Sequence, residues 1–457
     1  MEKVIKKTEI EKVPGKEVLG HALGGVGQNL IYGLWSSYIT IFYTDIFGLP
    51  AAFMGMMFLV ARIWDGVNDP MMGIMADRTR SKYGRFRVWL MRMPIFVAIC
   101  LILNFTVPSF GGTAKLVYAM ITYIMMGMAF TSVDIPYWSL PAAMSSDPSQ
   151  RTKIFTSSTL AANLATVGAG MLIVPLIGTL GKGDQQRGYF LVAVIFAIAG
   201  CILYLTCFGM VREHVQVSSE KFSFKLAIRS LVKNKPLLCI ICANFVINLA
   251  FLTKMAFGTY YTKYTLGDFK LMSIMSFLSL PGILIGTIMA PLLAKKFGKK
   301  YTLIIVTIAN LIISVLFFIT GYENLVLVFI FTCLQVTCVG AAFVMISSMT
   351  ADTIEYGEWQ TGQRNEAVIT STRTLITKVA SAMTGLATAI ILVVANYQPN
   401  IEQTAATKSS FHFIASLLPG VVMMIGVIPM FFYELTEKRH AEIIEELNNR
   451  KNSGKEV

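Results

Sequence analysis

The stretch Arg62-Ile63-Trp64-Asp65-Gly66-Val67-Asn68-Asp69-Pro70 places two carboxylates and a guanidinium inside an apolar segment that runs from about Met54 to Met75. In a helix Arg62, Asp65 and Asp69 have the spacing i, i+3 and i+7, so they project from one face and can meet a single partner. An ionisable side chain at membrane depth costs at least about 2.5–3.5 kcal/mol on insertion scales, and such residues usually line a path for an ion or a solute. The stretch therefore predicts a membrane-spanning helix whose charged groups serve a function.

The whole chain is strongly apolar. Its 457 residues are 55% hydrophobic and 14% charged, with a mean hydropathy of +0.62, whereas a soluble domain carries about 25% charged residues. A spanning helix needs about 20 apolar residues. Twelve such segments are present, near residues 18–46, 51–75, 88–108, 114–143, 153–180, 187–211, 237–262, 271–294, 301–320, 324–350, 366–396 and 410–435. We therefore expect an all-α membrane protein with twelve transmembrane helices in two six-helix bundles.

The net charge of +13 does not indicate a nucleic-acid partner, because the basic residues follow the predicted spans. With both termini inside, 28 Lys and Arg residues fall in the inner stretches and only six fall in the outer loops. Such an asymmetry obeys the positive-inside rule. It predicts a multi-pass protein of the cell inner (plasma) membrane with both termini cytoplasmic. The polar N-terminus shows no cleavage site of a signal peptide.

The longest interior polar stretch, residues 211–235, divides the predicted spans into two sets of six. Halves of this kind rock about a central site in many transporters. Short basic turns that contain a glycine follow the second span of each half, at 76–85 and at 294–300, and form a faint internal repeat. The expected boundaries are a cytoplasmic N-terminus at 1–17, a six-helix bundle at 18–211, a central cytoplasmic loop at 212–236, a second bundle at 237–435, and a solvated or membrane-surface cytoplasmic tail at 436–457.

A third carboxylate, Asp134, lies in the fourth predicted span. Nearby Pro136 removes one backbone donor and so frees a carbonyl one turn earlier, and the Thr131 hydroxyl adds another oxygen. If the second and fourth spans are neighbours, the oxygens of Asp65, Asp69, Thr131 and Asp134 surround one small cation. Na⁺ is a possible ion at the three carboxylates.

Several carboxylates in a low dielectric cannot all stay ionised without a counter-charge. A bound Na⁺, a proton, or nearby Arg62 and Lys378 would balance them. Lys378 lies among small residues in the eleventh predicted span, where another helix can approach closely, and its ammonium fits a mobile partner of the acidic cluster. Fixed ion pairs that hold helices together are the alternative for all of these groups. Lys254 in the seventh span either extends toward the outer face or meets a carboxylated substrate.

Aromatic and amide side chains on the first and fourth spans form a candidate sugar-facing wall. Sugars present C–H faces to aromatic rings, and their hydroxyls bond to amides and carboxylates. Trp138 lies one turn from Asp134 on the same helix face. A role in the core or at the membrane interface is the alternative for each aromatic residue. The predicted substrate-binding set is Gln28, Asn29, Tyr32, Asp134, Tyr137, Trp138, Lys378 and Arg373.

Five motifs together resemble one family. They are RIWDGVNDP at 62–70, DRTRSKYGRFR at 77–87, DIPYWSL at 134–140, Lys378 followed by ASAMTG at 380–385, and NYQPNIEQ at 396–403. Their order along the chain resembles that of the glycoside-pentoside-hexuronide:cation symporters of the major facilitator superfamily, and the chain is similar to the melibiose carrier, the best-known member. The resemblance implies a transporter and not an enzyme. Such a transporter imports a glycoside, pentoside or hexuronide with Na⁺ or H⁺ by alternating access.

The resemblance also implies roles for residues. It implies a cation site at Asp65, Asp69, Thr131 and Asp134, coupling or charge balance at Arg62 and Lys378, and a cytoplasmic gate at Asp77, Arg78, Arg80, Gly84 and Arg85. The partners that it implies are a small sugar, the coupling cation and the lipid bilayer, with no other cofactor and with a functional monomer.

One departure bears on the substrate. The melibiose carrier contacts its galactoside with a Lys-Asp pair on the first span, where this chain has Gln28-Asn29. An ionised aspartate would repel a uronate, whereas Asn29 offers a neutral donor and acceptor, so an acidic sugar is permitted without being required. Two alternatives on the same fold are a symporter of lysophospholipids or other amphiphiles and a sugar sensor that does not transport. The four His residues are scattered, and no nucleophile motif indicates an enzyme.

Overall fold

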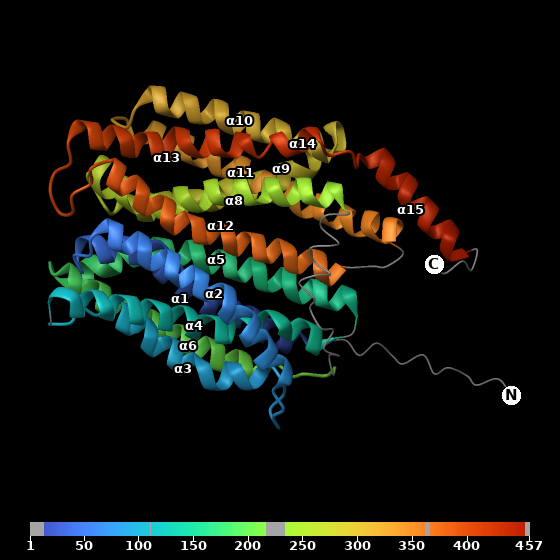
Figure 1. Cartoon of the computed structure of the whole chain (residues 1–457), viewed down its shortest axis with the longest axis horizontal. Coiled ribbons are helices and arrows are strands. Elements are labelled where there is room, and N and C mark those ends of the chain that lie inside the picture. Colours follow the sequence, from blue (N-terminus) through green and yellow to red (C-terminus); the bar gives the residue numbers. More distant parts are fainter. Residues whose placement is uncertain (1–12, 110, 146, 216–233, 362–365, 453–457) are drawn as a thin grey trace. The chain divides into compact units, whose positions relative to one another are not determined.

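The structure is a computed structural model that describes residues 13–109, 111–145, 147–215, 234–361 and 366–452. All regular secondary structure in these residues is helical (Figure 1). Backbone contacts divide the chain into two compact units. Unit 1 comprises Met1–Phe42 and Val60–Ser219, and unit 2 comprises Tyr43–Leu59 and Glu220–Val457. The first boundary falls inside a continuous helix, since α1 runs from Gly15 to Asp45.

Unit 1 holds most of α1 (Gly15–Asp45) and α2 (Ala51–Arg78), with α3 (Arg87–Asn104), α4 (Gly112–Met144), α5 (Pro148–Gly181) and α6 (Gln185–Met210). Helix α3 packs on α4 and α6, and α5 packs on α6. Glycines bring α1 close to these helices. A Cβ at Gly27 would lie 2.9 Å from the carbonyl oxygen of Gly200 on α6, so only glycine permits this backbone approach.

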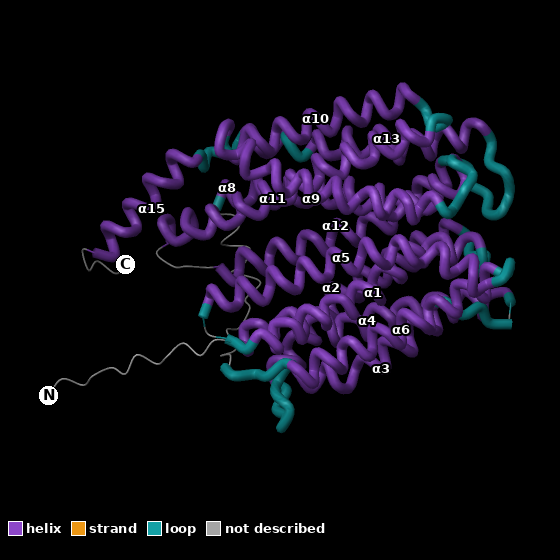
Figure 2. Tube along the Cα trace, turned by 180° about the vertical axis from the view of Figure 1, so that it is seen from behind, coloured by secondary structure: helices purple, strands orange, loops and turns teal. Residues whose placement is uncertain are grey.

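Unit 2 holds α8 (Lys235–Tyr260), the π-helical turn η1 (Tyr261–Thr265), α9 (Leu271–Phe297), α10 (Lys299–Thr320), α11 (Leu325–Thr361), α12 (Glu366–Val394), α13 (Ala405–Ile425), α14 (Ile428–Phe431) and α15 (Glu437–Asn452). Helix α11 packs on α9 and α10, and α8 packs on α12 and α13. Figure 2, seen from behind, shows α10 and α13 side by side, in agreement with their contacts.

Small residues hold α9 against α11. A Cβ at Gly282 would lie 2.9 Å from the carbonyl oxygen of Cys333, and a Cβ at Gly286 would lie 2.9 Å from the amide nitrogen of Ala341. The stretch Gly282-Ile-Leu-Ile-Gly286 has the G-x-x-x-G spacing that lets two membrane helices meet backbone to backbone. This contact is part of the core of unit 2, because Ala341 is buried.

Helices occupy all twelve predicted spans. Nine of those among the described residues are long and apolar enough to cross a membrane, namely α3, α4, α5, α6, α8 with η1, α9, α10, α11 and α13 with α14. The charges of Arg62, Asp65 and Asp69 make α2 less apolar than these. The predicted all-α membrane fold is thereby confirmed. The predicted bundle boundaries at 18–211 and 237–435 stay predictions.

The tail, which was expected to be solvated or at the membrane surface, docks on unit 2 by one side of α15 in the part that the structure describes, while most of its charged side chains stay exposed. Helix α15 packs on α11, and the side chain of Ile443 is completely buried. Polar contacts add to this docking. The Trp359 indole donates to Glu446 at 2.6 Å, and His440 hydrogen-bonds to Glu355. The tail is therefore a part of unit 2.

Candidate functional site

Helices α2 and α4 are neighbours at the charged stretch of α2. A Cβ on Gly127 of α4 would lie 3.3 Å from Oδ1 of Asp65, so the absence of a side chain there leaves room for this carboxylate. Nη1 of Arg62 donates to Oδ2 of Asp65 at 3.0 Å. The guanidinium also interacts with Tyr32 of α1 and Tyr123 of α4. Arg62 and Asp65 therefore form a pair that joins α2 to its neighbours.

Asp134 forms a second polar pair, with Gln28 of α1. The Nε2 of Gln28 donates to Oδ1 of Asp134. The side chain of Gln28 is buried, and its Oε1 accepts no hydrogen bond within the described part of the chain. Thr131, one turn earlier on α4, is also buried. The predicted cation ligands on α4 thus face the interior of unit 1.

Asp69 lies one turn beyond Asp65 on α2. Helices α2 and α4 run in the same direction, because α3 returns the chain between them, and both rise about 1.5 Å per residue. Asp65 lies beside Gly127, so Asp69, four residues further along α2, lies at about the same height along the helix axes as Thr131, four residues further along α4. No three His, Cys, Asp or Glu side chains form a metal-holding group within the described ranges. The structure thus brings these residues onto neighbouring helices without gathering the three carboxylates into one coordination shell.

Trp138 and Tyr137 differ in their surroundings. Tyr137 is completely buried, its hydroxyl donates to the carbonyl oxygen of His21 at 2.8 Å, and its ring stacks on His21 with centroids 4.3 Å apart. The Trp138 indole is half-buried and lies flat on Phe155 of α5, with centroids 6.1 Å apart and 4° between the planes. In this structure Tyr137 joins α1 to α4, and Trp138 retains exposed surface.

The amide of Asn29 is engaged within unit 1. Its Nδ2 donates to the carbonyl oxygen of Gly25 at 2.9 Å, and its Oδ1 accepts a bond of 3.1 Å from the Thr166 hydroxyl of α5. Tyr32 stacks on Phe130 of α4 with centroids 5.2 Å apart. The predicted substrate residues of α1 therefore face α4 and α5.

Three predicted cations lie in unit 2. Arg373 and Lys378 belong to α12, but their side chains lie outside the described residues. Of the two alternatives predicted for Lys254 of α8, extension toward the outer face is not found, because its ammonium donates to Oε1 of Gln335 on α11. The small cavity beside Lys254 is lined by residues of α8, α10, α11 and α13, including Asn310. Lys254 is thus turned into the interior of unit 2.

The predicted gate occupies the turn between α2 and α3. Arg85 pairs with Asp77, whereas Arg78 and Arg80 are exposed. Gly84 adopts φ +107°, a left-handed conformation that favours glycine. These contacts tie the end of α2 to the start of α3.

Sequence reasoning missed Glu213, which lies just after α6. Its carboxylate accepts hydrogen bonds of 2.8 Å from each of the backbone nitrogens of Arg85, Phe86 and Arg87. These amides are the free donors at the N-terminus of α3, where a negative charge is favourable. A Cβ at Gly84 would lie 2.6 Å from Oε1 of Glu213. The one signal in the sequence was a carboxylate directly after the sixth predicted span.

Comparisons with known proteins agree with this architecture. A family model described as MFS/sugar transport protein matches residues 20–437. The isoprimeverose transporter of Lactiplantibacillus pentosus is 31% identical over 93% of this chain and 89% of its own length. The glucuronide carrier protein homolog of Escherichia coli (strain K12) is 28% identical over 96% of this chain and 97% of its own length. A crystal structure of a D-xylose-proton symporter superimposes with a TM-score of 0.65 at 10% identity, over 92% of this chain and 98% of that one.

Proposed function

Because this chain belongs to the MFS/sugar transport protein family, whose model matches residues 20–437, we propose that it carries a sugar-like solute together with a cation by alternating access. The observation that carries the proposal is the pair of polar contacts inside unit 1. Arg62 holds Asp65 at 3.0 Å, and Gln28 holds Asp134. Ionisable groups on two adjacent spans of a membrane transporter usually line a substrate or ion path.

The coupling cation binds between α2 and α4. In the arrangement described here Arg62 balances Asp65, so a cation that enters must compete with the guanidinium for that carboxylate. Asp69 and Thr131 lie level with each other on the two helices and supply the remaining oxygens together with Asp134. Na⁺ and H⁺ both satisfy this electrostatic requirement, because each neutralises a carboxylate in a low dielectric. Coupling is reciprocal, so the solute tightens cation binding by the same factor by which the cation tightens solute binding.

The solute is a glycoside, a pentoside or a hexuronide. The names of an isoprimeverose transporter and a glucuronide carrier homolog among the relatives support this range. The Trp138 indole offers a face for sugar C–H groups, and the neutral amides of Gln28 and Asn29 neither repel nor require a carboxylate on the sugar. Lys378 and Arg373 of α12 are further candidate contacts. The protein acts as a monomer in the plasma membrane with both termini in the cytoplasm.

Counterflow with purified protein in liposomes tests the substrate. Neutral glycosides, pentosides and glucuronides are compared as solutes, and a saturable exchange of at least one class is the expected result. Absence of exchange for every member of the panel would count against sugar transport. Uptake in Na⁺-free buffer over a range of pH then separates the two cations, since uptake that is unchanged without Na⁺ excludes sodium coupling.

The variant Asp69→Asn tests the cation site. It keeps the size of the side chain and removes the charge, so we expect loss of cation-driven accumulation with retention of counterflow. Asp268→Asn is the matched control, because Asp268 is an exposed carboxylate that accepts from the backbone nitrogen of Lys270 at 2.8 Å. Concentrative uptake with an unchanged cation dependence in Asp69→Asn would contradict the proposed site.

A further inference from the structure

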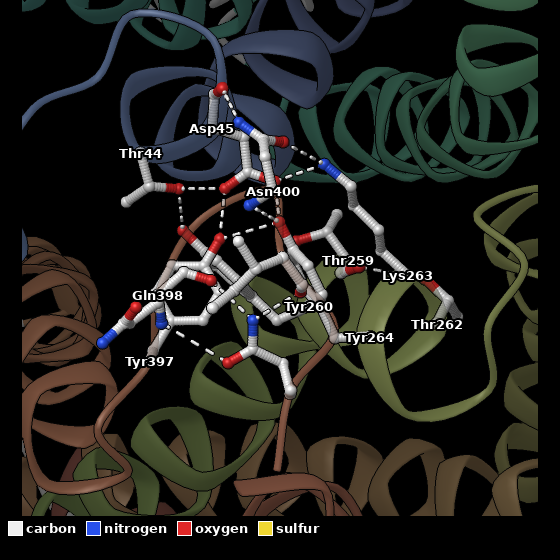
Figure 3. A network of polar contacts seen from close by, with 12 residues as sticks. Thr44, Asp45, Thr259, Tyr260, Thr262, Lys263, Tyr264, Tyr397, Gln398 and Asn400 are labelled. Carbon is white, nitrogen blue, oxygen red and sulfur yellow. Dashed lines mark hydrogen bonds and ion pairs between the residues drawn. The ribbon is translucent and has the colours of Figure 1, made fainter.

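The end of α1 is held in unit 2 by a dense polar cluster around Asp45 (Figure 3). The Asp45 carboxylate accepts hydrogen bonds from the hydroxyls of Tyr397 and Tyr264 and pairs with the Lys263 ammonium. The Thr44 hydroxyl adds a bond of 2.8 Å. The Asp45 side chain is 1% exposed and that of Lys263 is 18% exposed. A buried carboxylate is thus surrounded by donors from η1 and from the loop between α12 and α13.

The groups that receive Asp45 hold one another in position without it. The Tyr397 hydroxyl lies 3.0 Å from that of Tyr264, and the Tyr260 and Tyr397 rings meet edge to face, with centroids 5.4 Å apart. The Gln403 amide, which is buried, bonds to the carbonyl oxygens of Gln398 and Ile401 within the same loop. These groups therefore form a preformed binding site for Asp45. We call this site the socket and define it as Lys263, Tyr264 and residues 395–403.

Asn400 completes the socket. It adopts φ +60°, a left-handed conformation that asparagine adopts more readily than other residues with a side chain. In this conformation its Nδ2 donates to the backbone carbonyl oxygen of Asp45, and its backbone nitrogen donates to the Tyr264 hydroxyl at 3.1 Å. The left-handed conformation therefore places Asn400 so that it holds the last residue of α1.

The segment that contains Asp45 belongs to unit 2, although it joins two helices of unit 1. Residues 43–59 are grouped with unit 2, whereas the rest of α1 and the rest of α2 are grouped with unit 1. Close packing adds to the polar contacts. A Cβ at Gly55 would lie 2.9 Å from the Cβ of Ala389 on α12, and a Cβ at Gly385 would lie 3.0 Å from the Phe58 ring. Any movement of unit 1 against unit 2 must strain or undock this segment.

The polar contacts between Asp45 and the socket can open with only a small rise in free energy. When Asp45 leaves the socket, water solvates the carboxylate, the ammonium and the hydroxyls, so the lost hydrogen bonds are replaced. Burial and the charge of Asp45 raise the pKa of Tyr397 above its usual range, so this hydroxyl stays protonated and available as a donor at neutral pH. The closed form is therefore stable without being permanent.

We propose that Asp45 and its socket form a reversible latch, which keeps residues 43–59 docked on unit 2 and releases them once in each transport cycle. This inference rests on the proposed alternating access. Under the predicted topology the latch lies at the outer end of α1, so its release opens the carrier to the outside. Asp45 acts on transport through the docked segment rather than by contact with the solute.

Labelling of an introduced cysteine tests the latch. Leu49 is buried within the docked segment, so Leu49→Cys becomes reactive to a membrane-impermeant maleimide added to intact cells only when the segment undocks. In the Asp45→Asn background we expect labelling to accelerate roughly tenfold or more, the factor that corresponds to one lost charge-assisted hydrogen bond. The amide also turns a donor toward Lys263 and the tyrosines, which are donors themselves. The protein without the reporter cysteine gives the background from native cysteines.

Glu402→Gln is the matched control, because the Glu402 side chain, although it belongs to the same loop, is 87% exposed and pairs with Lys408 at 3.0 Å rather than with Asp45. Tyr397→Phe removes one hydrogen-bond donor to Asp45 and keeps the ring. If the Asp45→Asn protein does not reach the membrane, labelling of Leu49→Cys in the Tyr397→Phe background tests the latch instead. Its effect should be smaller than that of Asp45→Asn and not additive with it, since both act on one cluster. Unchanged labelling in both variants overturns the latch.

The labelling needs neither solute nor transport, so it is independent of the proposed function. Faster labelling in a protein that fails every counterflow assay would support the latch and reject sugar transport. Slow labelling in a variant that still transports would reject the latch alone.

Discussion

Gly286→Ala is expected to separate α9 from α11. A Cβ at residue 286 would lie 2.9 Å from the amide nitrogen of Ala341 and closer still to the carbonyl oxygen of Thr337. Both atoms belong to the backbone of α11 and cannot rotate away, so relief requires a shift of a whole helix. Overpacking of this kind costs about 1–3 kcal/mol in a well-packed core.

The size of the effect follows from the ordinary relation between free energy and melting temperature. In domains of 150–250 residues each kcal/mol shifts the midpoint by about 2–4 °C, so we expect Gly286→Ala to lower the apparent midpoint by about 2–12 °C. The matched control is Gly178→Ala on α5, where the new Cβ has no neighbour within 4 Å among the described residues. Alanine is favoured over glycine in a helix by about 0.8–1.0 kcal/mol, so the control should be neutral or slightly stabilising.

The measurement is thermal unfolding of both purified variants in the same detergent, read as the fraction that remains monodisperse after heating. Opposite signs for Gly286→Ala and Gly178→Ala support the backbone contact between α9 and α11. Equal midpoints for the two variants, or a lower midpoint for the control alone, would refute it.

Three further results are expected. Arg62→Gln should tighten cation binding by about tenfold, because the Arg62 guanidinium, which competes with the cation for Asp65 through a charge-assisted hydrogen bond, is removed. The half-saturating cation concentration for uptake measures this effect, and weaker cation binding would contradict the pairing. Glu213→Ala should lower the free energy of unfolding by about 1–2 kcal/mol through loss of the cap on α3, measured against Glu213→Gln, which should lose less. Tyr137→Phe should lose about 1 kcal/mol of stability with its bond to His21 and leave the counterflow KM unchanged; a raised KM would show that the hydroxyl meets the solute.

The apolar segments and the charges of α2 could be predicted from sequence because both are local. Segment length fixes which residues cross a membrane, and the i, i+3 spacing alone brings Arg62 to Asp65. The closeness of α2 and α4 was a condition of the predicted site rather than a prediction. It depends on Gly127, whose missing side chain makes room for the carboxylate, and no local pattern in the sequence of α4 indicates that this glycine faces α2.

The polar clusters that cross long stretches of chain could not be predicted. Asp45 is one carboxylate at a helix end, and its partner Tyr397 lies 352 positions later. Neither residue stands out from the sequence around it, and only the fold brings the two together. The G-x-x-x-G spacing of Gly282 and Gly286, in contrast, is visible in the sequence and would have predicted a close helix contact. The docking of the tail was not predicted, because its charges conceal the apolar side of α15 that carries Ile443.

The two basic turns that echo each other in the sequence share one construction. Gly84 before α3 has φ +107° and Gly298 before α10 has φ +84°. In each turn a carboxylate fills the space that a Cβ on the glycine would need and accepts a hydrogen bond from a backbone N–H near the start of the next helix. This carboxylate comes from later in the same unit, from Glu213 in the first turn and from Glu437 in the second. Repetition of such a cap is expected of duplicated halves. Each cap lies wholly within one unit, so both can persist while the units move, whereas the contacts of Asp45 hold a segment of unit 2 that continues at both ends into helices of unit 1.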